Sequence, residues 1–463
     1  MQITEYPLSK LTHGSGYKLD VTRLRHLPRQ GGDLLMDRQS GRWILLDHDD
    51  AALIPLLGAG FDTMLPEPLR LRVDALHASL SEHGVGYLRP EQKFGALTTI
   101  ILKLTNACNL ACTYCYDHED IERATVLRSD LIEKTLTEAL DLVEHRLWVI
   151  LHGGEPTLLW PEIEKSVLLG KRLAAERGKV IDFSGQTNLT RLTQQMVDFS
   201  SAHGIAWGVS LDGPQAIHDK FRIRHNGRGS FDLFERALRD FPDFVRNCGV
   251  MTTVTSANAA KLLEIAKYFY ERGMAAWDWS LFQPIGRARQ SEAFEPDVQE
   301  VLDSWDRLFA AVERGEFDGY PIKPVTKYLD NFLHGPGGNM CMRGDCGAGR
   351  DLLSISADGK IEACDCIDPL GPLSGLGYSG VTSLAAARAS PVAEQIRSRD
   401  MSGHAVCKSC IWYGVCGGTC LAHAQGIDNI WGLGCEVAKL AFDRISQSLS
   451  HHDRLLDYKK SLS

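Results

Sequence analysis

The sequence predicts an α/β protein whose strands run in parallel as a barrel or an open sheet. Short apolar runs rich in β-branched residues recur along the middle of the chain, each followed by turn residues, at Leu97–Leu104, Leu147–Leu151, Val180–Phe183, Ile205–Leu211, Val250–Val254 and Ala276–Phe282. Helical patterns separate these runs. Strand and helix alternate over six units, as in parallel α/β folds, whose active sites lie at the carboxyl ends of the strands.

The segment 258–272 is one of these helical patterns. Its apolar residues recur at helical spacing between Leu262 and Phe269. Asn258 is the predicted N-cap, and Gly273 is the predicted stop because glycine readily adopts the conformation that ends a helix.

The first 95 residues differ from the rest of the chain. They contain no cysteine, whereas residues 341–435 hold nine of the thirteen. Apolar and polar residues alternate in two runs on either side of a polar turn at 37–41, namely Asp33–Met36 and Trp43–Leu46. Two further runs have helical patterns, namely Ala51–Leu57 and Leu69–Leu80. We therefore expect a small α+β module of two or three strands and two helices, which most simply caps the barrel.

Composition excludes several classes of protein. The chain has 463 residues, 44% hydrophobic and 24% charged, which is typical of globular domains. Its 50 basic and 59 acidic residues give no basic excess for nucleic acid. No apolar run approaches the roughly 20 residues of a membrane span, and the start lacks a secretory signal. We expect a cytosolic protein without a membrane or nucleic-acid partner, whose thiols bind metal or act in catalysis.

Three cysteines follow the first predicted strand closely, at Cys108, Cys112 and Cys115. Thiolates hold iron–sulfur clusters, and three ligands leave one iron of a [4Fe–4S] cluster open for a substrate or cosubstrate. The alternative is a zinc site whose fourth ligand is His118.

Polar groups also follow the next three predicted strands. The second strand ends in Gly153, Gly154 and Glu155. The glycines would allow the backbone to approach a ligand closely, and the carboxylate suits binding of an ammonium group. Asn188 and Ser210 end the third and fourth. A Gly-Gly-Glu-Pro sequence alone is usually a turn, but the repetition at successive strand ends favours an active site.

These residues resemble the radical S-adenosylmethionine (radical SAM) superfamily, whose C-x3-C-x2-C signature is matched in full. The resemblance covers about residues 97–290 and implies a partial (β/α)6 TIM-like barrel. It implies that the three thiolates bind a [4Fe–4S] cluster, and that residues around it bind S-adenosylmethionine (AdoMet): Tyr114, Gly153, Gly154, Glu155, Asn188, Ser210 and Arg222. For Arg222, the alternative is a solvated arginine.

Downstream, eight cysteines occupy the positions of two complete four-thiolate sites. Spacing alone would also suit two zinc knuckles. The pattern resembles the cysteine-rich SPASM domain of radical SAM peptide-modifying enzymes. That resemblance implies two auxiliary [4Fe–4S] clusters, one held by Cys341, Cys346, Cys364 and Cys420, the other by Cys407, Cys410, Cys416 and Cys435. Some relatives leave the position of Cys341 without a ligand.

Three further residues have separate interpretations. Asp365 follows a predicted ligand and corresponds to the proposed general base of anaerobic sulfatase-maturating enzymes; the alternative is an aspartate that accepts from loop amides. Cys248 is predicted to be a small buried hydrophobe, and Cys366 a bystander unless it contacts substrate.

The resemblance implies five regions: a peptide-recognition-like module (1–95), the radical SAM barrel (96–310), a bridging region (311–340), the SPASM domain (341–440) and a C-terminal helix or tail (441–463). The first is similar to winged-helix-like elements with which peptide maturases capture a leader peptide by strand addition.

The resemblance therefore implies a maturase of a ribosomally synthesised precursor peptide. Its three [4Fe–4S] clusters and AdoMet would generate a 5′-deoxyadenosyl radical, remove a substrate hydrogen and form a carbon–carbon (cyclophane) or thioether crosslink. A flavodoxin or ferredoxin would supply electrons. The alternatives are a sulfatase-type maturase that oxidises Cys or Ser to formylglycine, and a non-catalytic iron–sulfur or zinc scaffold.

Overall fold

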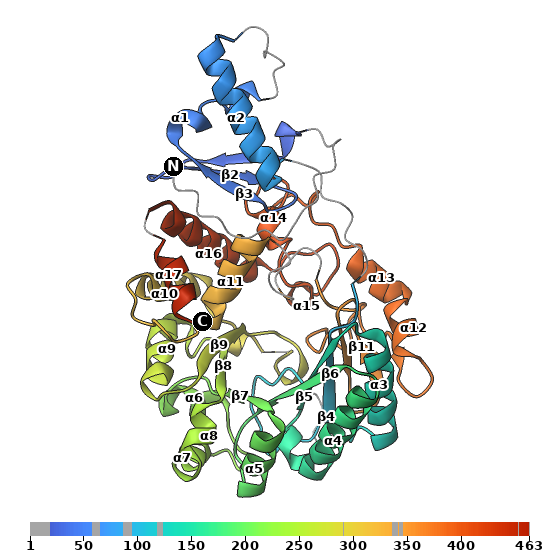
Figure 1. The fold of residues 1–463 in the computed structure, drawn as a ribbon. Helices are drawn as coiled ribbons and strands as arrows, with labels where there is room; N and C mark the ends of the chain where they lie inside the picture. The colour runs from blue at the N-terminus through green and yellow to red at the C-terminus, as the bar shows by residue number, and fades with distance from the viewer. Residues whose placement is uncertain are drawn as a thin grey trace.

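The structure is a computed structural model that describes residues 19–57, 65–86, 95–117, 124–289, 291–335, 341, 346–451 and 453–462. Its centre is a nine-stranded sheet in the order β12-β11-β10-β4-β5-β6-β7-β8-β9 (Figure 1). The strands of this sheet are β4 (Thr99–Thr105), β5 (Arg146–Gly153), β6 (Val180–Thr187), β7 (Ala206–Ser210), β8 (Gly249–Val254), β9 (Ala276–Leu281), β10 (Leu352–Ile355), β11 (Lys360–Glu362) and β12 (Gly377–Tyr378).

Strands β4 to β9 pair in parallel and in chain order. The six predicted strands are thus confirmed, and the protein has a mixed α/β fold with a large parallel sheet. The helices that follow these strands are α3 (Ser129–Leu142), α4 (Trp160–Glu176), α5 (Gln194–His203), α6 (Gln215–Phe221), α7 (Phe231–Asp240), α8 (Pro242–Arg246) and α9 (Leu262–Glu271). In β5 the alternate residues Leu147, Val149 and Leu151 are buried, whereas the residues between them are exposed or partly exposed.

The later part of the chain extends this sheet, which the sequence did not predict. β10 pairs in parallel with β4, and β11 and β12 add antiparallel strands beyond it. The remaining helices are α10 (Val298–Glu313), α11 (Lys323–His334), α12 (Leu384–Arg388), α13 (Pro391–Arg397), α14 (Tyr413–Cys416), α15 (Leu421–Ala424), α16 (Gly432–His451) and α17 (Arg454–Ser461). The cysteine-rich region is therefore joined to the barrel by backbone hydrogen bonds.

Helix α9 begins later than predicted. A short 3-10 helix precedes it, and Asn258 does not cap it. The Asn258 side chain instead donates to the backbone carbonyls of Asp212 and Thr253, at 3.2 and 2.9 Å. The N-cap prediction was wrong because a cap needs the side-chain oxygen, and Asn258 Oδ1 accepts instead from the Thr255 N–H at 2.8 Å, in the turn before the helix. The stop is confirmed, since Gly273 has a φ of +72°.

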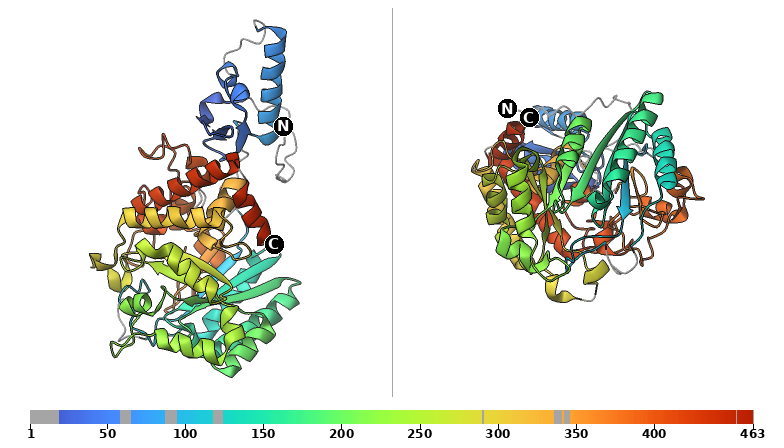
Figure 2. Two further views of the ribbon diagram at one scale, coloured as in Figure 1. Left: turned by 90° about the vertical axis from the view of Figure 1, so that its left-hand side faces the viewer. Right: turned by 90° about the horizontal axis from the view of Figure 1, so that it is seen from below.

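The N-terminal elements form a separate layer of their own (Figure 2). β1 (Leu24–Leu27), β2 (Asp33–Asp37) and β3 (Trp43–Leu46) make an antiparallel sheet in that order, so the two predicted strands are confirmed and a third precedes them. Helix α2 (Glu67–His83) covers the predicted stretch Leu69–Leu80. The predicted stretch Ala51–Leu57 contains only the last residue of α1 (His48–Ala51) and a 3-10 turn at Ile54–Leu56. These elements have their own small apolar core.

This module lies against the cysteine-rich region and the bridging region (Figure 1). The Arg38 guanidinium donates to the carbonyls of Ser402 and Cys407, at 2.8 and 3.2 Å. The indole of Trp43 donates to the Phe332 carbonyl at 2.7 Å. The module is thus fastened to the segment that carries Cys407.

We expect Gly41→Ala to loosen this contact. Gly41 has a φ of +70°, and an added Cβ would lie 2.4 Å from the Gly414 carbonyl oxygen. Gly204→Ala is the matched control because its φ of +64° is similar but nothing lies within 4 Å. Left-handed strain costs about 1–2 kcal/mol in both variants. Thermal unfolding should show a greater loss for Gly41→Ala, and equal losses would mean that the contact adds nothing.

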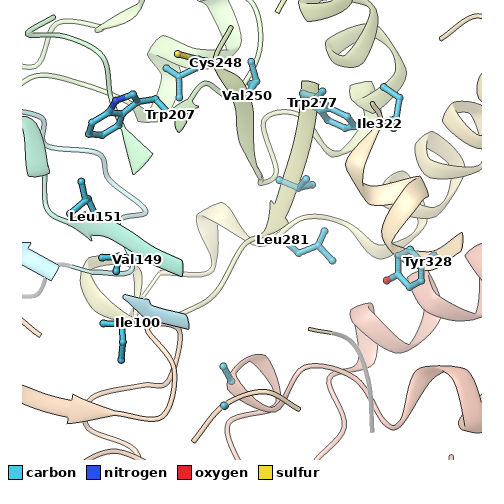
Figure 3. Packing of buried hydrophobic residues seen from close by; sticks show 14 of the residues in the cluster. Ile100, Val149, Leu151, Trp207, Cys248, Val250, Trp277, Leu281, Ile322 and Tyr328 are labelled. Atoms are coloured by element: carbon cyan, nitrogen blue, oxygen red, sulfur yellow. The ribbon is translucent and has the colours of Figure 1, made fainter. Parts of the chain in front are cut away.

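One apolar core joins residues of the parallel strands to α11 and α16, and Figure 3 shows part of it, from Ile100 to Tyr328. Trp277 of β9 is fully buried and donates to Thr252 at 2.9 Å. Tyr328 and Phe332, within the predicted bridging region, are buried on α11 against Phe442 of α16. Burial of each such side chain stabilises the fold by about 1.5–3 kcal/mol.

In the part of the chain that the structure describes, none of the helices has both the length and the apolar character required to cross a bilayer.

Candidate active site

The end of β5 lies against the segment that enters the first cysteine loop. Gly154 N–H donates to the Thr105 carbonyl at 2.7 Å, and Glu155 N–H donates to the Ala107 carbonyl at 2.9 Å. Gly153 has a φ of +116°, and a Cβ on Gly154 would lie 2.1 Å from the Ala107 oxygen. The two glycines therefore permit a close approach between backbones, whereas the sequence had suggested an approach to a ligand.

The three thiols of this loop are buried or half-buried. Burial raises the pKa of Cys108 and of Cys115 to about 12, so both stay protonated unless a cation binds the thiolates. Arg222 Nη1 lies 4.0 Å from Cys112 Sγ, and Arg287 donates to the Cys112 carbonyl at 2.6 Å. Two guanidinium groups thus face a set of ligands that would be negative when metal is bound.

The donor set of the first loop fits an iron–sulfur cluster. It consists of three thiols, one fewer than the four ligands of a closed structural zinc site. Three thiolates can hold a [4Fe–4S] cluster with one iron left open. His118, the fourth ligand of the zinc alternative, lies outside the described residues.

Glu155 holds two strand ends together. It is 1% exposed, and its carboxylate accepts hydrogen bonds from Thr187 Oγ1 and the Asn188 N–H, both at 2.7 Å, and from Thr157 Oγ1 at 2.6 Å. Burial raises its pKa, although these hydrogen bonds oppose the shift. In the structure Glu155 links β5 to the end of β6, and its contact with an ammonium group stays a prediction.

Asn188 and Ser210 lie at neighbouring strand ends, as predicted from the sequence. Asn188 Nδ2 donates to Asn109 Oδ1 at 2.9 Å and lies 3.7 Å from Cys108 Sγ. Ser210 Oγ accepts from Gln186 at 2.8 Å. Asn188 is therefore brought to the first cysteine loop, whereas Ser210 is held by the adjacent strand.

Tyr114 and Arg222 form one buried group beside the same loop. The Arg222 guanidinium stands over the Tyr114 ring, 5.4 Å from its centroid. Its side chain is only 11% exposed and pairs with Asp212 at 3.1 Å. The alternative of a solvated arginine is therefore wrong, because a charged partner at the end of β7 keeps this side chain inside.

Asp365 lies in a buried polar cluster between the first loop and the cysteine-rich region. Tyr116 donates to its carboxylate at 3.1 Å, and Lys103 donates to its carbonyl at 3.3 Å. Burial alone would raise the pKa of Asp365, but His152, Lys103 and these hydrogen bonds lower it overall. The carboxylate is thus held in its ionised, proton-accepting form.

Sequence reasoning missed three members of this cluster, namely Lys103, Asp117 and His152. Lys103 Nζ pairs with Asp117 at 2.5 Å, which links β4 to the residue that lies two positions after Cys115. Burial lowers the pKa of His152. A signal was present, because Lys103 is the one charged residue in the otherwise apolar or hydroxylic strand Thr99–Thr105.

The eight downstream cysteines gather into two groups. The Cys341 thiol interacts electrostatically with Cys346, Cys364 and Cys420, and the Cys407 thiol with Cys410, Cys416 and Cys435. A single pocket is lined by all four cysteines of the second group, together with Val406, Trp412 and Lys439. The structure therefore brings together the same two sets that the resemblance implied, although their metal content stays a prediction.

The two remaining cysteines have different surroundings. Cys248 is 2% exposed and packs in the core (Figure 3), which confirms it as a small buried hydrophobe. The Cys366 thiol lies 3.7 Å from Asp365 Oδ1, next to Cys364, and its carbonyl accepts from Gln283 at 2.7 Å. Cys366 is thus part of the buried polar cluster and close to a predicted ligand.

Comparison with known proteins bears on the identity of this site. Residues 102–269 match the family model of the radical SAM superfamily. A cysteine-type anaerobic sulfatase-maturating enzyme of Clostridium novyi is 24% identical over 383 residues, which cover 79% of this chain and 99% of that protein. The family match over residues 102–269 therefore includes the strand ends and the first cysteine loop described above.

Two solved structures share the fold. The structure of anSMEcpe with bound AdoMet has a TM-score of 0.69 and 21% identity, covering 79% of this chain and 98% of that one. Streptococcus suis SuiB bound to precursor peptide SuiA has a TM-score of 0.55 and 14% identity, covering 90% and 100%. Radical SAM proteins hold a [4Fe–4S] cluster with AdoMet, which the three thiols of the first loop fit. The chain therefore carries a radical SAM domain and is an enzyme of that superfamily.

Proposed function

We propose that this enzyme matures a ribosomally synthesised precursor peptide by installing an intramolecular crosslink. The observation that carries the proposal is the N-terminal module, a three-stranded sheet fastened to the second cysteine group. The likeness to SuiB, whose structure holds a precursor peptide, spans 90% of this chain, whereas the likeness to anSMEcpe spans 79%.

A reduced [4Fe–4S] cluster with AdoMet would supply the 5′-deoxyadenosyl radical that removes a substrate hydrogen atom. In this proposal Cys108, Cys112 and Cys115 hold that cluster. The residues around it orient AdoMet, namely Tyr114, Gly153, Gly154, Glu155, Asn188, Ser210 and Arg222. Forming a new bond then requires one electron to leave the substrate, and the two downstream cysteine groups would hold its acceptors.

The N-terminal sheet offers edges for a leader peptide. Among the described residues, β1 and β3 each pair with only one strand, β2. An extended peptide can add a strand to such an edge through backbone hydrogen bonds, with side-chain pockets for specificity. The module would thus hold the leader while the core of the peptide reaches the carboxyl ends of β4 to β9.

A second candidate function is oxidation of a Cys or Ser side chain to formylglycine. Asp365 supports it, because this ionised carboxylate lies beside Cys364 and accepts from Tyr116. The sulfatase-maturating relative from Clostridium novyi supports it as well.

One experiment separates the two functions. Anaerobically reconstituted enzyme is incubated with AdoMet, reductant and either a short peptide encoded beside its gene or a sulfatase-derived peptide. A crosslink removes two hydrogens and leaves no aldehyde, whereas formylglycine reacts with a hydrazide probe. Crosslinking of the first peptide, dependent on its leader, supports the proposal; an aldehyde in the sulfatase peptide supports the second function. Zinc in place of iron would refute both.

We expect Asp365→Asn to separate substrate chemistry from AdoMet cleavage. Asparagine keeps the shape of the side chain but accepts no proton, so product should fall by about 10²-fold or more. Formation of 5′-deoxyadenosine should continue, because Asp365 lies outside the first cysteine loop. Product and 5′-deoxyadenosine are quantified from the same reaction.

Asp358→Asn is the control for this variant. Asp358 lies in the turn between β10 and β11, where it accepts from Ser356 at 2.6 Å. The Asp358→Asn variant should therefore leave the ratio of product to 5′-deoxyadenosine nearly unchanged. Retention of product in Asp365→Asn would remove Asp365 from the catalytic residues.

A further inference from the structure

Asp212, two residues after the end of β7, joins three parts of the candidate AdoMet site. One carboxylate oxygen, Oδ2, accepts from the Tyr114 hydroxyl at 2.5 Å. The other, Oδ1, pairs with Arg222 at 3.1 Å and accepts from the Thr253 N–H at 3.2 Å. Its side chain is 4% exposed. Because both oxygens are occupied by protein groups, Asp212 acts on its neighbours and not on a ligand directly.

The two side chains that Asp212 holds lie beside the first cysteine loop. Tyr114 stands between Cys112 and Cys115 in the chain. The Arg222 guanidinium lies over the Tyr114 ring and extends Nη1 to within 4.0 Å of Cys112 Sγ. The Arg222 guanidinium therefore lies between the Asp212 carboxylate and the Cys112 thiol, and it stacks over the Tyr114 ring.

Removal of the carboxylate would leave a buried cation without its partner. Unpaired buried charge is strongly unfavourable, so the guanidinium would move toward water or toward another anion. The Tyr114 hydroxyl would also lose its acceptor. Phe221 and Phe294 pack edge-on against the Tyr114 ring, so the ring itself has support that Arg222 lacks.

We propose that Asp212 is a positioning residue that sets AdoMet affinity by holding the Arg222 guanidinium against the first cysteine loop. This inference rests on the assignment of Arg222 and Tyr114 to AdoMet in the proposed function. Neither the cysteine signature nor the strand-end pattern gives Asp212 a role.

The test compares three variants of the full, anaerobically reconstituted protein. Asp212→Asn keeps size and removes charge, whereas Asp212→Glu restores charge. Asp182→Asn is the matched control, because Asp182 also pairs with an arginine, Arg146, at the opposite end of the sheet. AdoMet is titrated against the electron paramagnetic resonance spectrum of the reduced protein, and KM and kcat for 5′-deoxyadenosine formation are measured without peptide.

The Asp212→Asn protein should bind as much iron as wild type. Its spectral change should require an AdoMet concentration about tenfold higher or more, with a matching rise in KM and little change in kcat. Asp212→Glu should recover most of this loss, and Asp182→Asn should stay within about threefold of wild type. Wild-type affinity in Asp212→Asn, or an equal loss in Asp182→Asn, would overturn the proposal. Loss of first-loop iron in both Asp212 variants would also overturn it, because the role would then be structural. A wild-type spectrum that ignores AdoMet would refute the proposed function itself.

Discussion

Cys112→Ala is expected to reduce 5′-deoxyadenosine formation to background. Cys112 is one of three thiols on the first loop, so its loss leaves two protein ligands for a cluster that needs three. Cys410→Ala removes a thiol from the second downstream group, which the structure keeps separate from that loop. This variant should still cleave AdoMet, but without coupling the cleavage to product.

Iron content and 5′-deoxyadenosine are measured for both variants after anaerobic reconstitution. Cys248→Ala serves as the control, because Cys248 is buried in the core and interacts with neither set. It should retain iron and AdoMet cleavage. Equal losses in Cys112→Ala and Cys410→Ala would contradict the division of labour between the cysteine groups.

Gly154→Ala is expected to give the second large effect, a fall of about 10²-fold or more in 5′-deoxyadenosine formation. The added Cβ would lie 2.1 Å from the Ala107 oxygen and 2.6 Å from the Ala107 carbonyl carbon. These are backbone atoms, so the clash is relieved only if the segment entering Cys108 moves. A displacement of about 1 Å there would misplace the first cysteine loop relative to β5.

Gly249→Ala is the matched control for this variant. Gly249 begins β8, has no positive φ, and has nothing within 4 Å of an added Cβ. It should retain AdoMet cleavage within about threefold, and both variants should stay folded by circular dichroism. Unchanged cleavage in Gly154→Ala would show that the loop tolerates movement and that the backbone contact is not required.

Much of the barrel was predictable because its signals are local. The six parallel strands follow from short apolar runs, and the stop at Gly273 follows from one glycine. The N-cap at Asn258 failed because the Thr255 N–H donates to its side-chain oxygen, while its amide N–H groups donate to the carbonyls of Asp212 and Thr253. The addition of β10 beside β4 was not predictable either, because its hydrogen-bond partner lies some 250 residues earlier in the chain.

For the candidate site, residue types and spacing identified the cysteines, the glycines and the polar strand ends, since these depend on order along the chain. Packing decided what each side chain touches. It made Glu155 a link between β5 and β6, paired Arg222 with Asp212, and placed Lys103 between Asp117 and Asp365. Such pairs form only when the chain buries charged groups together, because a buried charge needs a partner and the sequence pattern does not show which distant residue supplies it.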